Sequence, residues 1–303
     1  MLRSITTSAQ AMAESTATDL TNRTNAAPSA PHDEDVLARL LAKARPLVMG
    51  VVNVTPDSFS DGGRFLDPKS AITQAERLAG EGADILDIGA ESTRPYGGAT
   101  PVSLAEERQR LEPVLRPAVA LGVPVSIDTI KAEVAAWALE TGAAIVNDVW
   151  GLQRDPDMAR VVAEHGAPVV IMHNRNAADP AIDIIRDVNE FFSRSLEIAW
   201  SAGIHRHRIV LDPGIGFGKT AEQSIACIAR LHAFAAFGLP LLVGASRKRF
   251  INTITPSEPM QRLGGSLAAH LLAVEHGAAI VRAHDVGPTV QALAVAAAIR
   301  RAR

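Results

Sequence analysis

The sequence predicts an α/β fold, namely a single (β/α)₈ barrel preceded by a disordered N-terminal tail. Three observations predict it. Eight short apolar runs recur along the chain, a longer amphipathic stretch follows each of them, and 303 residues is a usual length for one such barrel. A doubly wound open sheet built from the same units is the structural alternative.

The eight apolar runs predict parallel strands. Each run is continuous rather than alternating, which is typical of strands covered on both faces. Because eight runs alternate with helical stretches in one chain of this length, a closed barrel is favoured over an open sheet. The runs occupy residues 47–54, 83–90, 124–129, 143–149, 168–173, 209–214, 239–246 and 278–284.

Glycines close the helical stretches shortly before the next run begins. A residue directly after a helix often needs positive φ, which glycine adopts without strain from a Cβ atom. These glycines are Gly82, Gly122, Gly142, Gly166, Gly203, Gly238 and Gly277.

Several helical stretches also begin with recognisable signals. Three aspartates stand directly before proline and predict an N-cap followed by proline at the first helical position. These are Asp67, Asp155 and Asp179. Two further pairs, Ser103 with Glu106 and Thr220 with Gln223, have the spacing of a capping box. A last helix is expected over 287–301.

Composition excludes several classes of partner. Lys and Arg total 30 against 33 Asp and Glu, and aromatic residues are only 4%, so neither nucleic acid nor a membrane surface is an expected partner. No apolar run approaches the roughly 18 residues that span a bilayer. The one cysteine, Cys227, is expected to fill space in the core. A cytoplasmic location fits this cysteine content.

The N-terminal segment differs from the rest of the chain. Residues 1–35 are rich in Ser, Thr, Ala and Asn and show no apolar periodicity, which predicts a disordered extension. The barrel domain is therefore expected to span residues 36–303.

Polar residues gather where the predicted strands end, and in a barrel these ends share one mouth that carries the chemistry. Cations there suit diphosphate oxygens, whereas carboxylates and an amide suit a flat heterocycle with adjacent N–H donors. A hard cation such as Mg²⁺ fits these ligands, because HExxH and histidine clusters with transition-metal spacing are absent. The cations are Arg94, Lys248, Arg282 and His284, the deeper polar residues are Asp128, Asn147 and Asp212, and Asn53 and His173 stand at two further strand ends.

Two loops at this mouth are distinctive. Residues 53–63 follow the first strand, and their polar, turn-rich composition around Phe59 is typical of a mobile lid. Residues 212–220 are glycine-rich but fail the Walker pattern, because Pro213 stands where its first glycine is needed. We interpret this second loop as a flexible turn into the sixth helix, with Phe217 projecting into the mouth.

Seven segments in order resemble dihydropteroate synthases, and together they span roughly residues 46–300. That family has the same (β/α)₈ fold. The resemblance implies joining of 6-hydroxymethyl-7,8-dihydropterin diphosphate to p-aminobenzoate, two small-molecule substrates, with Mg²⁺ as the cofactor and a homodimer as the assembly. The segments are MGVVNVTPDSFSDGG at 49–63, ESTRP at 91–95, SIDT at 126–129, VND at 146–148, LDPGIGFGK at 211–219, GASRK at 244–248 and VRAHDV at 281–286.

The resemblance also implies roles for individual residues. The pterin ligands would be Asp128, Asn147, Asp212 and Lys248. The diphosphate ligands would be Asn53, Thr93, Arg282 and His284, with Asn53 also near Mg²⁺. The p-aminobenzoate site would be formed by Phe59, Arg94, Pro95, Phe217 and Ser246. Among these, Asn53, Lys248, Arg282 and His284 are the expected catalytic residues.

Departures from the family pattern lie in three places. The segment YGGATP after Pro95 is about two residues longer than the common form and lies beside the expected p-aminobenzoate pocket. Asn174 to Asn176 and Trp150 also replace residues that are usual in the family. Two other functions remain open at this point. One is a pterin-dependent methyltransferase, which has little need of the diphosphate cations, and the other is a non-catalytic pterin-binding paralogue.

Overall fold

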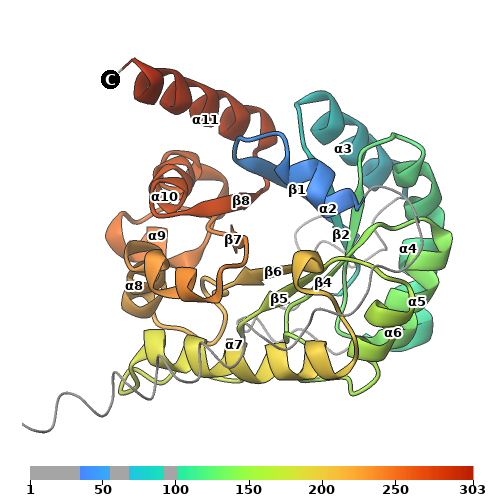
Figure 1. The fold of residues 1–303 in the computed structure, drawn as a ribbon. Coiled ribbons are helices and arrows are strands. Elements are labelled where there is room, and N and C mark those ends of the chain that lie inside the picture. Colours follow the sequence, from blue (N-terminus) through green and yellow to red (C-terminus); the bar gives the residue numbers. More distant parts are fainter. Residues whose placement is uncertain (1–34, 55–67, 92–101, 303) are drawn as a thin grey trace, which may run out of the picture. The chain divides into compact units, whose positions relative to one another are not determined.

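A closed barrel of eight parallel strands forms the centre of the protein (Figure 1). The computed structural model describes residues 35–54, 68–91 and 102–302. Because β1 pairs with β8 as well as with β2, the sheet has no open edge, and the alternative of an open sheet is wrong. The strands are β1 (Leu47–Asn53), β2 (Ile85–Gly89), β3 (Val125–Asp128), β4 (Ile145–Asp148), β5 (Val169–Met172), β6 (Ile209–Asp212), β7 (Leu241–Val243) and β8 (Ala278–Ala283).

Helices separate successive strands and surround the barrel (Figure 1). Each predicted apolar run contains one strand, so the predicted order of strands is confirmed. The α-helices are α2 (Val36–Leu41), α3 (Pro68–Gly80), α4 (Leu104–Val119), α5 (Ala132–Thr141), α6 (Met158–Glu164), α7 (Ile184–Ser201), α8 (Ala221–Ala229), α9 (Arg249–Ile254), α10 (Leu263–Glu275) and α11 (Val286–Arg301). Short 3₁₀ helices are η1 (Arg206–Arg208), η2 (Leu231–Phe237) and η3 (Pro259–Gln261).

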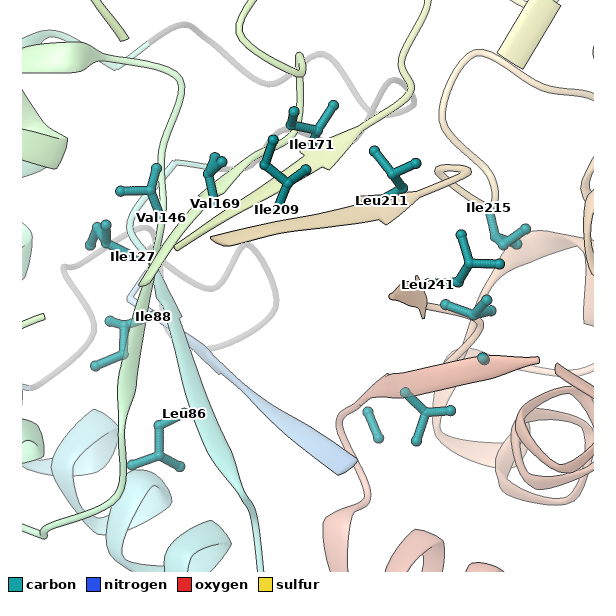
Figure 2. Packing of buried hydrophobic residues seen from close by; sticks show 14 of the residues in the cluster. Leu86, Ile88, Ile127, Val146, Val169, Ile171, Ile209, Leu211, Ile215 and Leu241 are labelled. Carbon is teal, nitrogen blue, oxygen red and sulfur yellow. The ribbon is translucent and has the colours of Figure 1, made fainter. Parts of the chain in front are cut away.

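The larger hydrophobic core lies between the strands and the surrounding helices. Strands β2, β3, β4 and β6 contribute Ile88, Ile127, Val146 and Leu211 to it (Figure 2). Helices contribute apolar faces, and Phe192 of α7 is completely buried there. Burial of this apolar surface on both faces of each strand explains why the strand sequences are continuous apolar runs.

A second core fills the amino-terminal half of the barrel interior. Side chains two residues apart on one strand point to the same face, so Leu47 and Met49 of β1 both belong to this core. Leu37 and Leu40 of the short helix α2 pack against them and close this end. The interior of the amino-terminal half is therefore apolar, and polar groups can face inward only near the carboxyl ends of the strands.

The predicted helix endings are confirmed. All seven of the glycines expected to close helical stretches have positive φ, from 58° at Gly166 to 113° at Gly142. An added Cβ at Gly142 would lie 3.0 Å from Val119, so space as well as backbone conformation favours glycine there.

The predicted helix starts are partly wrong. Thr220 and Gln223 form the expected capping box, and the Ser103 side chain accepts from the backbone N–H of Glu106. By contrast, α6 begins at Met158 and α7 at Ile184, two and four residues later than their aspartate–proline pairs predict. Asp155 instead accepts a hydrogen bond from the backbone N–H of Ala132, and Asp179 one from that of Ala181. Asp155 thus satisfies the first backbone donor of the preceding helix α5, and Asp179 stabilises a loop, since a short carboxylate can accept from any nearby backbone N–H. Asp67 lies outside the described residues.

The first described helix, α2, begins at Val36, the first residue of the expected barrel domain. Asp35, assigned from the sequence to the tail, caps α2 by accepting from the backbone N–H of Leu37. The disorder predicted for the preceding residues falls outside the described part of the chain. Within that part, none of the helices is long and apolar enough to cross a membrane.

Candidate active site

The carboxyl ends of the strands bring most of the predicted site residues to one mouth. Asn53, Asp128 and Asp212 are the last residues of β1, β3 and β6. Asn147 lies in β4 and Arg282 in β8. The remaining described residues follow strands β6, β7 and β8 and are Phe217, Ser246, Lys248 and His284. Four predicted residues lie outside the described part of the chain, namely Phe59, Thr93, Arg94 and Pro95.

A buried cluster of charges crosses the barrel at this mouth. The Arg282 guanidinium donates through Nε to Asp87 Oδ2 at 2.6 Å and through Nη2 to Asp128 Oδ2 at 3.0 Å. The Asn147 amide donates to the same Asp87 oxygen at 3.1 Å. One arginine thus donates to two carboxylates. The cluster joins Asp128 and Asn147, which are predicted pterin ligands, to Arg282, which is a predicted diphosphate ligand.

This cluster carries more negative charge than its one cation neutralises. Burial, followed by the nearby negative charge of Asp87, raises the pKa of Asp128 to about 7. Although burial opposes the charge on Arg282, Asp87 and Asp128 raise its pKa above the usual value, so the guanidinium stays charged. Among the described residues, the Oδ1 atoms of Asp87 and Asp128 have no hydrogen-bond partner. The cluster is therefore suited to accept N–H donors from a ligand.

Asp212 forms a second carboxylate site across the mouth. Its side chain is 4% exposed, and Oδ1 accepts from the backbone N–H of Gly214 at 2.7 Å. Burial raises the pKa of Asp212 to about 6, against the opposing effects of the Gly214 hydrogen bond and of the Lys248 charge. Asp212 is thus mostly ionised at neutral pH, and a ligand that donates two hydrogen bonds would relieve the cost of burying it.

Lys248 and Phe217 lie together at the edge of the mouth. The Lys248 ammonium is 4.0 Å from the centroid of the Phe217 ring, within the range of a cation–π interaction. Phe217 packs against Val149 and Met172 and is 9% exposed. The two residues thus form one wall at this edge of the mouth.

The Ser246 and His284 side chains also meet. The Ser246 Oγ accepts from the backbone N–H of His284 at 3.1 Å and lies 3.0 Å from its Nδ1 atom. Between Ser246 and Lys248, Arg247 has a left-handed backbone with φ of 58°. Its guanidinium forms an ion pair with Asp285. This backbone shape is uncommon for a residue with a Cβ atom, and the ion pair stabilises it.

A metal site of protein ligands alone is not present in the described part of the chain. No group of three or more His, Cys, Asp or Glu side chains there could hold an ion. Asn53 is partly exposed at the end of β1 and offers one amide oxygen. A Mg²⁺ ion that keeps several waters and binds mainly to substrate oxygens is compatible with such a sparse set.

Two residues of the site escaped the sequence interpretation. Asp87 lies in the middle of the strand segment ILDIG and is 0% exposed, so an argument from polar residues at strand ends does not include it. A carboxylate inside a continuous apolar run could have revealed it, because a buried charge requires a partner. Lys219 is 2% exposed in the glycine-rich loop, and the sequence assigns it no role beyond its place in the segment LDPGIGFGK.

Most of the sequence matches one family of known proteins. The family described as "Pterin binding enzyme" matches residues 49–284. The dihydropteroate synthase of Bacillus subtilis is 47% identical over 248 residues, covering 80% of this chain and 85% of the relative. That of Synechocystis is 45% identical over 266 residues, covering 85% and 91%.

Solved structures of the same group superimpose on the barrel. A Xanthomonas albilineans dihydropteroate synthase with 4-aminobenzoic acid has a TM-score of 0.80 and 46% identity, covering 84% of this chain and 93% of that one. The same enzyme in complex with 7,8-dihydropteroate has a TM-score of 0.77 and 43% identity, covering 84% and 94%. A Yersinia pestis enzyme with a sulfonamide drug has a TM-score of 0.80 and 41% identity, covering 85% and 95%. With its barrel, its polar mouth and these relatives, the chain belongs to the pterin-binding enzyme family, and within it to the dihydropteroate synthases.

Proposed function

We propose that the chain condenses 6-hydroxymethyl-7,8-dihydropterin diphosphate with p-aminobenzoate to give 7,8-dihydropteroate and diphosphate. As a dihydropteroate synthase it is a transferase of folate biosynthesis. The observation that carries the proposal is the buried Asp87–Arg282–Asp128 cluster, which offers carboxylate oxygens to a heterocycle and a cation to a diphosphate at one mouth. The relatives' structures with 4-aminobenzoic acid and 7,8-dihydropteroate support the choice of substrates.

The pterin would lie among Asp128, Asn147 and Asp212. A carboxylate accepts two parallel hydrogen bonds, so Asp212 suits the amino group and the adjacent ring N–H of the pterin. Lys248 would donate to the oxygen side of the ring. The raised pKa values of Asp128 and Asp212 support this arrangement, because both carboxylates are buried without enough donors of their own.

Diphosphate departure would depend on Arg282, His284 and Asn53. Arg282 keeps its charge in this site, and His284 is held by Ser246 at the same edge. The Arg282 charge and hydrogen bonds from His284 would stabilise the negative charge that develops on the leaving group. Mg²⁺, bound to diphosphate oxygens and to the Asn53 amide, would supply further charge neutralisation.

The bond between the pterin methylene carbon and the aniline nitrogen would form in the space that lies between the pterin site and the Phe217–Lys248 wall. The bond between the pterin methylene and the diphosphate oxygen breaks, and both electrons leave with the diphosphate. The dihydropterin ring delocalises the resulting cation, and the nearby carboxylates favour that charge. The neutral aniline nitrogen attacks the methylene and then loses its proton to diphosphate or water. Sulfonamides would compete for this acceptor site.

A homodimer and a cytoplasmic location are also part of the proposal. Apolar side chains are exposed on η3 and on the neighbouring helices α10 and α11, where Met260 is 71%, Leu272 49% and Ile299 58% exposed. Such residues are suited to an interface between two copies. Sedimentation equilibrium of the purified protein tests this, and a monomer at micromolar concentration would contradict it.

The activity is tested by incubating the protein with Mg²⁺ and both substrates. We expect pyrophosphate release and a dihydropteroate peak by chromatography, each dependent on both substrates. Arg282→Ala should lower turnover by about a hundredfold, because one transition-state charge partner is lost. Tight pterin binding without product would instead indicate a non-catalytic pterin-binding protein, and methyl transfer would indicate a methyltransferase.

A further inference from the structure

Three titratable side chains form a row behind the glycine-rich loop, in which Lys219 and His173 are buried and the Asp187 side chain is 32% exposed. Lys219 Nζ lies 2.6 Å from His173 Nδ1, and His173 Nε2 lies 2.9 Å from Asp187 Oδ2. Lys219 is 2% and His173 1% exposed. The three residues come from the loop after β6, the end of β5 and helix α7, so the row joins three elements. None of them contacts the reacting groups in the proposed reaction.

Hydrogen bonding fixes the protonation state of His173. A lysine ammonium only donates, so Nδ1 must accept and the ring proton must lie on Nε2, where it is donated to Asp187. Burial, together with the charge of Lys219, lowers the pKa of His173 to about 4, which agrees with a neutral ring. Burial lowers the pKa of Lys219 to about 8, so it still carries a proton to donate at neutral pH.

The loop that Lys219 ends is anchored elsewhere by Ile215, which is 1% exposed in the core, and by the Gly216 N–H, which donates to Ser224 Oγ at 3.2 Å. Gly214, Gly216 and Gly218 all have positive φ, between 55° and 80°. An added Cβ at Gly214 would lie 2.0 Å from the His173 carbonyl oxygen, and one at Gly218 would lie 2.6 Å from that of Arg175. The loop backbone therefore packs directly on the segment after β5, and its glycines add no side-chain contacts there beyond those of Ile215 and Phe217.

Lys219 also anchors the loop backbone at Phe217. Besides contacting His173, its Nζ donates to the Phe217 carbonyl oxygen at 3.1 Å. The Phe217 ring lies against the ammonium of Lys248. A continuous set of contacts thus runs from helix α7 through His173 and Lys219 to the aromatic wall of the acceptor site.

We propose that Lys219 is a positioning residue for the acceptor, holding the Phe217 ring in place through its hydrogen bonds to His173 and to the Phe217 carbonyl. The inference rests on the proposed function, because it takes Phe217 as part of the p-aminobenzoate site. The pterin ligands should be less affected. Asp212 belongs to β6, whose register with β5 is fixed by the barrel, and Asp128 and Asn147 lie on other strands.

Steady-state kinetics of Lys219→Met, with each substrate varied in turn, test the proposal. Methionine keeps the length and apolar stem of lysine but donates no hydrogen bond. We expect KM for p-aminobenzoate to rise about tenfold or more, because a buried hydrogen bond from a charged group is lost, while KM for the pterin diphosphate changes less than about threefold. Equal changes in both KM values, or no change, would overturn the proposal.

A milder variant and a matched control distinguish the proposed effect from a folding defect of Lys219→Met. Asp187→Asn weakens the far end of the row and should raise KM for p-aminobenzoate in the same direction but by less. Glu190→Gln is the matched control, because Glu190 lies on the same helix and pairs only with Arg186 among the described residues. It should leave both KM values unchanged. A normal p-aminobenzoate KM in Asp187→Asn, or a raised one in Glu190→Gln, would overturn the role of the row.

Hydrogen exchange separates this proposal from the proposed function. The peptide covering 212–220 should exchange at least about tenfold faster in Lys219→Met than in the unaltered protein, whereas peptides of β1 and β3 should not. This readout does not depend on turnover. If the unaltered protein made no dihydropteroate, the proposed function would fail while the hold on the loop could still be measured, and unchanged exchange in the variant would refute the hold.

Discussion

Two buried aspartates at opposite ends of the barrel have opposite electrostatic surroundings. Asp84 precedes β2 at the amino-terminal end and is 3% exposed. Its carboxylate accepts from Lys43, from both terminal nitrogens of Arg45 and from the backbone N–H of Val48. Burial acts to raise its pKa, but these donors outweigh burial, and the pKa of Asp84 lies below its usual value.

Asp128 at the carboxyl end is mostly buried, with its side chain 11% exposed, but lacks such donors. It shares Arg282 with Asp87, and its Oδ1 has no partner among the described residues. Burial and the neighbouring Asp87 therefore raise its pKa. The comparison teaches that the amino-terminal end of the barrel satisfies its charges and stabilises the fold. The carboxyl end keeps unsatisfied charges that a ligand can use, at a cost in stability.

The largest effect is expected for Asp128→Asn. Asparagine keeps the shape but removes the charge, so kcat/KM for the pterin diphosphate should fall by about a hundredfold to a thousandfold. Because Arg282 then has a single carboxylate to serve, Tm should rise by about 3 °C at pH 7.5. Thermal unfolding followed by circular dichroism measures the second effect. A lower Tm would contradict the view that this end is electrostatically unsatisfied.

Asp84→Asn should have the reverse outcome. Asparagine cannot satisfy both Lys43 and Arg45, and since those cations are partly exposed we expect a loss of about 2 kcal/mol in the free energy of unfolding. Urea unfolding measures this loss. Activity at 25 °C should be unchanged, because Asp84 lies at the far end of the barrel from the mouth. A large loss of activity in a folded variant would remove the distinction between the two ends.

Asp87→Asn sharpens the comparison within the mouth. Asp87 orients Arg282 and Asn147 through one oxygen, so the loss of its charge should lower kcat/KM for the pterin diphosphate by about thirtyfold. KM for p-aminobenzoate should change little. Asp84→Asn serves as the matched control, since it removes the same charge elsewhere. An unaltered kcat/KM would show that Arg282 needs no such partner.

The smallest effect is the pH dependence of stability due to Asp128. The pKa of the Asp128 carboxyl group is raised in the folded state, so ionising it is less favourable there than in the unfolded chain. Asp128 therefore lowers the free energy of unfolding increasingly as the pH rises from about 4 to about 7. The stability difference between Asp128→Asn and the unaltered protein should therefore grow across this range, on the order of 1 kcal/mol, and level off above it. His173 and His270, whose pKa values burial lowers, contribute with the opposite sign in both proteins, and the difference removes them. Urea unfolding at several pH values would contradict the assignment if the difference were constant.

Local sequence patterns were reliable where the local chain decides the outcome. The apolar runs contain the eight strands, and the closing glycines have positive φ, because strand burial and backbone conformation depend on neighbouring residues. The predicted starts of α6 and α7 were wrong because Asp155 bonds to the first residue of α5 and Asp179 bonds to loop backbone, so neither caps the helix that follows it. Resemblance to the dihydropteroate synthases named the mouth residues, and the structure brings the described ones to one end of the barrel.

The sequence by itself therefore determined the order of strands and helices, the end of the barrel that carries polar groups, and the family. Only the tertiary structure decided which charges meet. Asp87 and Arg282 are 195 residues apart, yet they form a hydrogen bond of 2.6 Å across the barrel. Likewise, burial and the charge of Lys219 keep His173 neutral, and Asp187, on another element, accepts the proton of its Nε2 atom. Burial and pairing between distant segments set these charges, and no local pattern of residues contains that information.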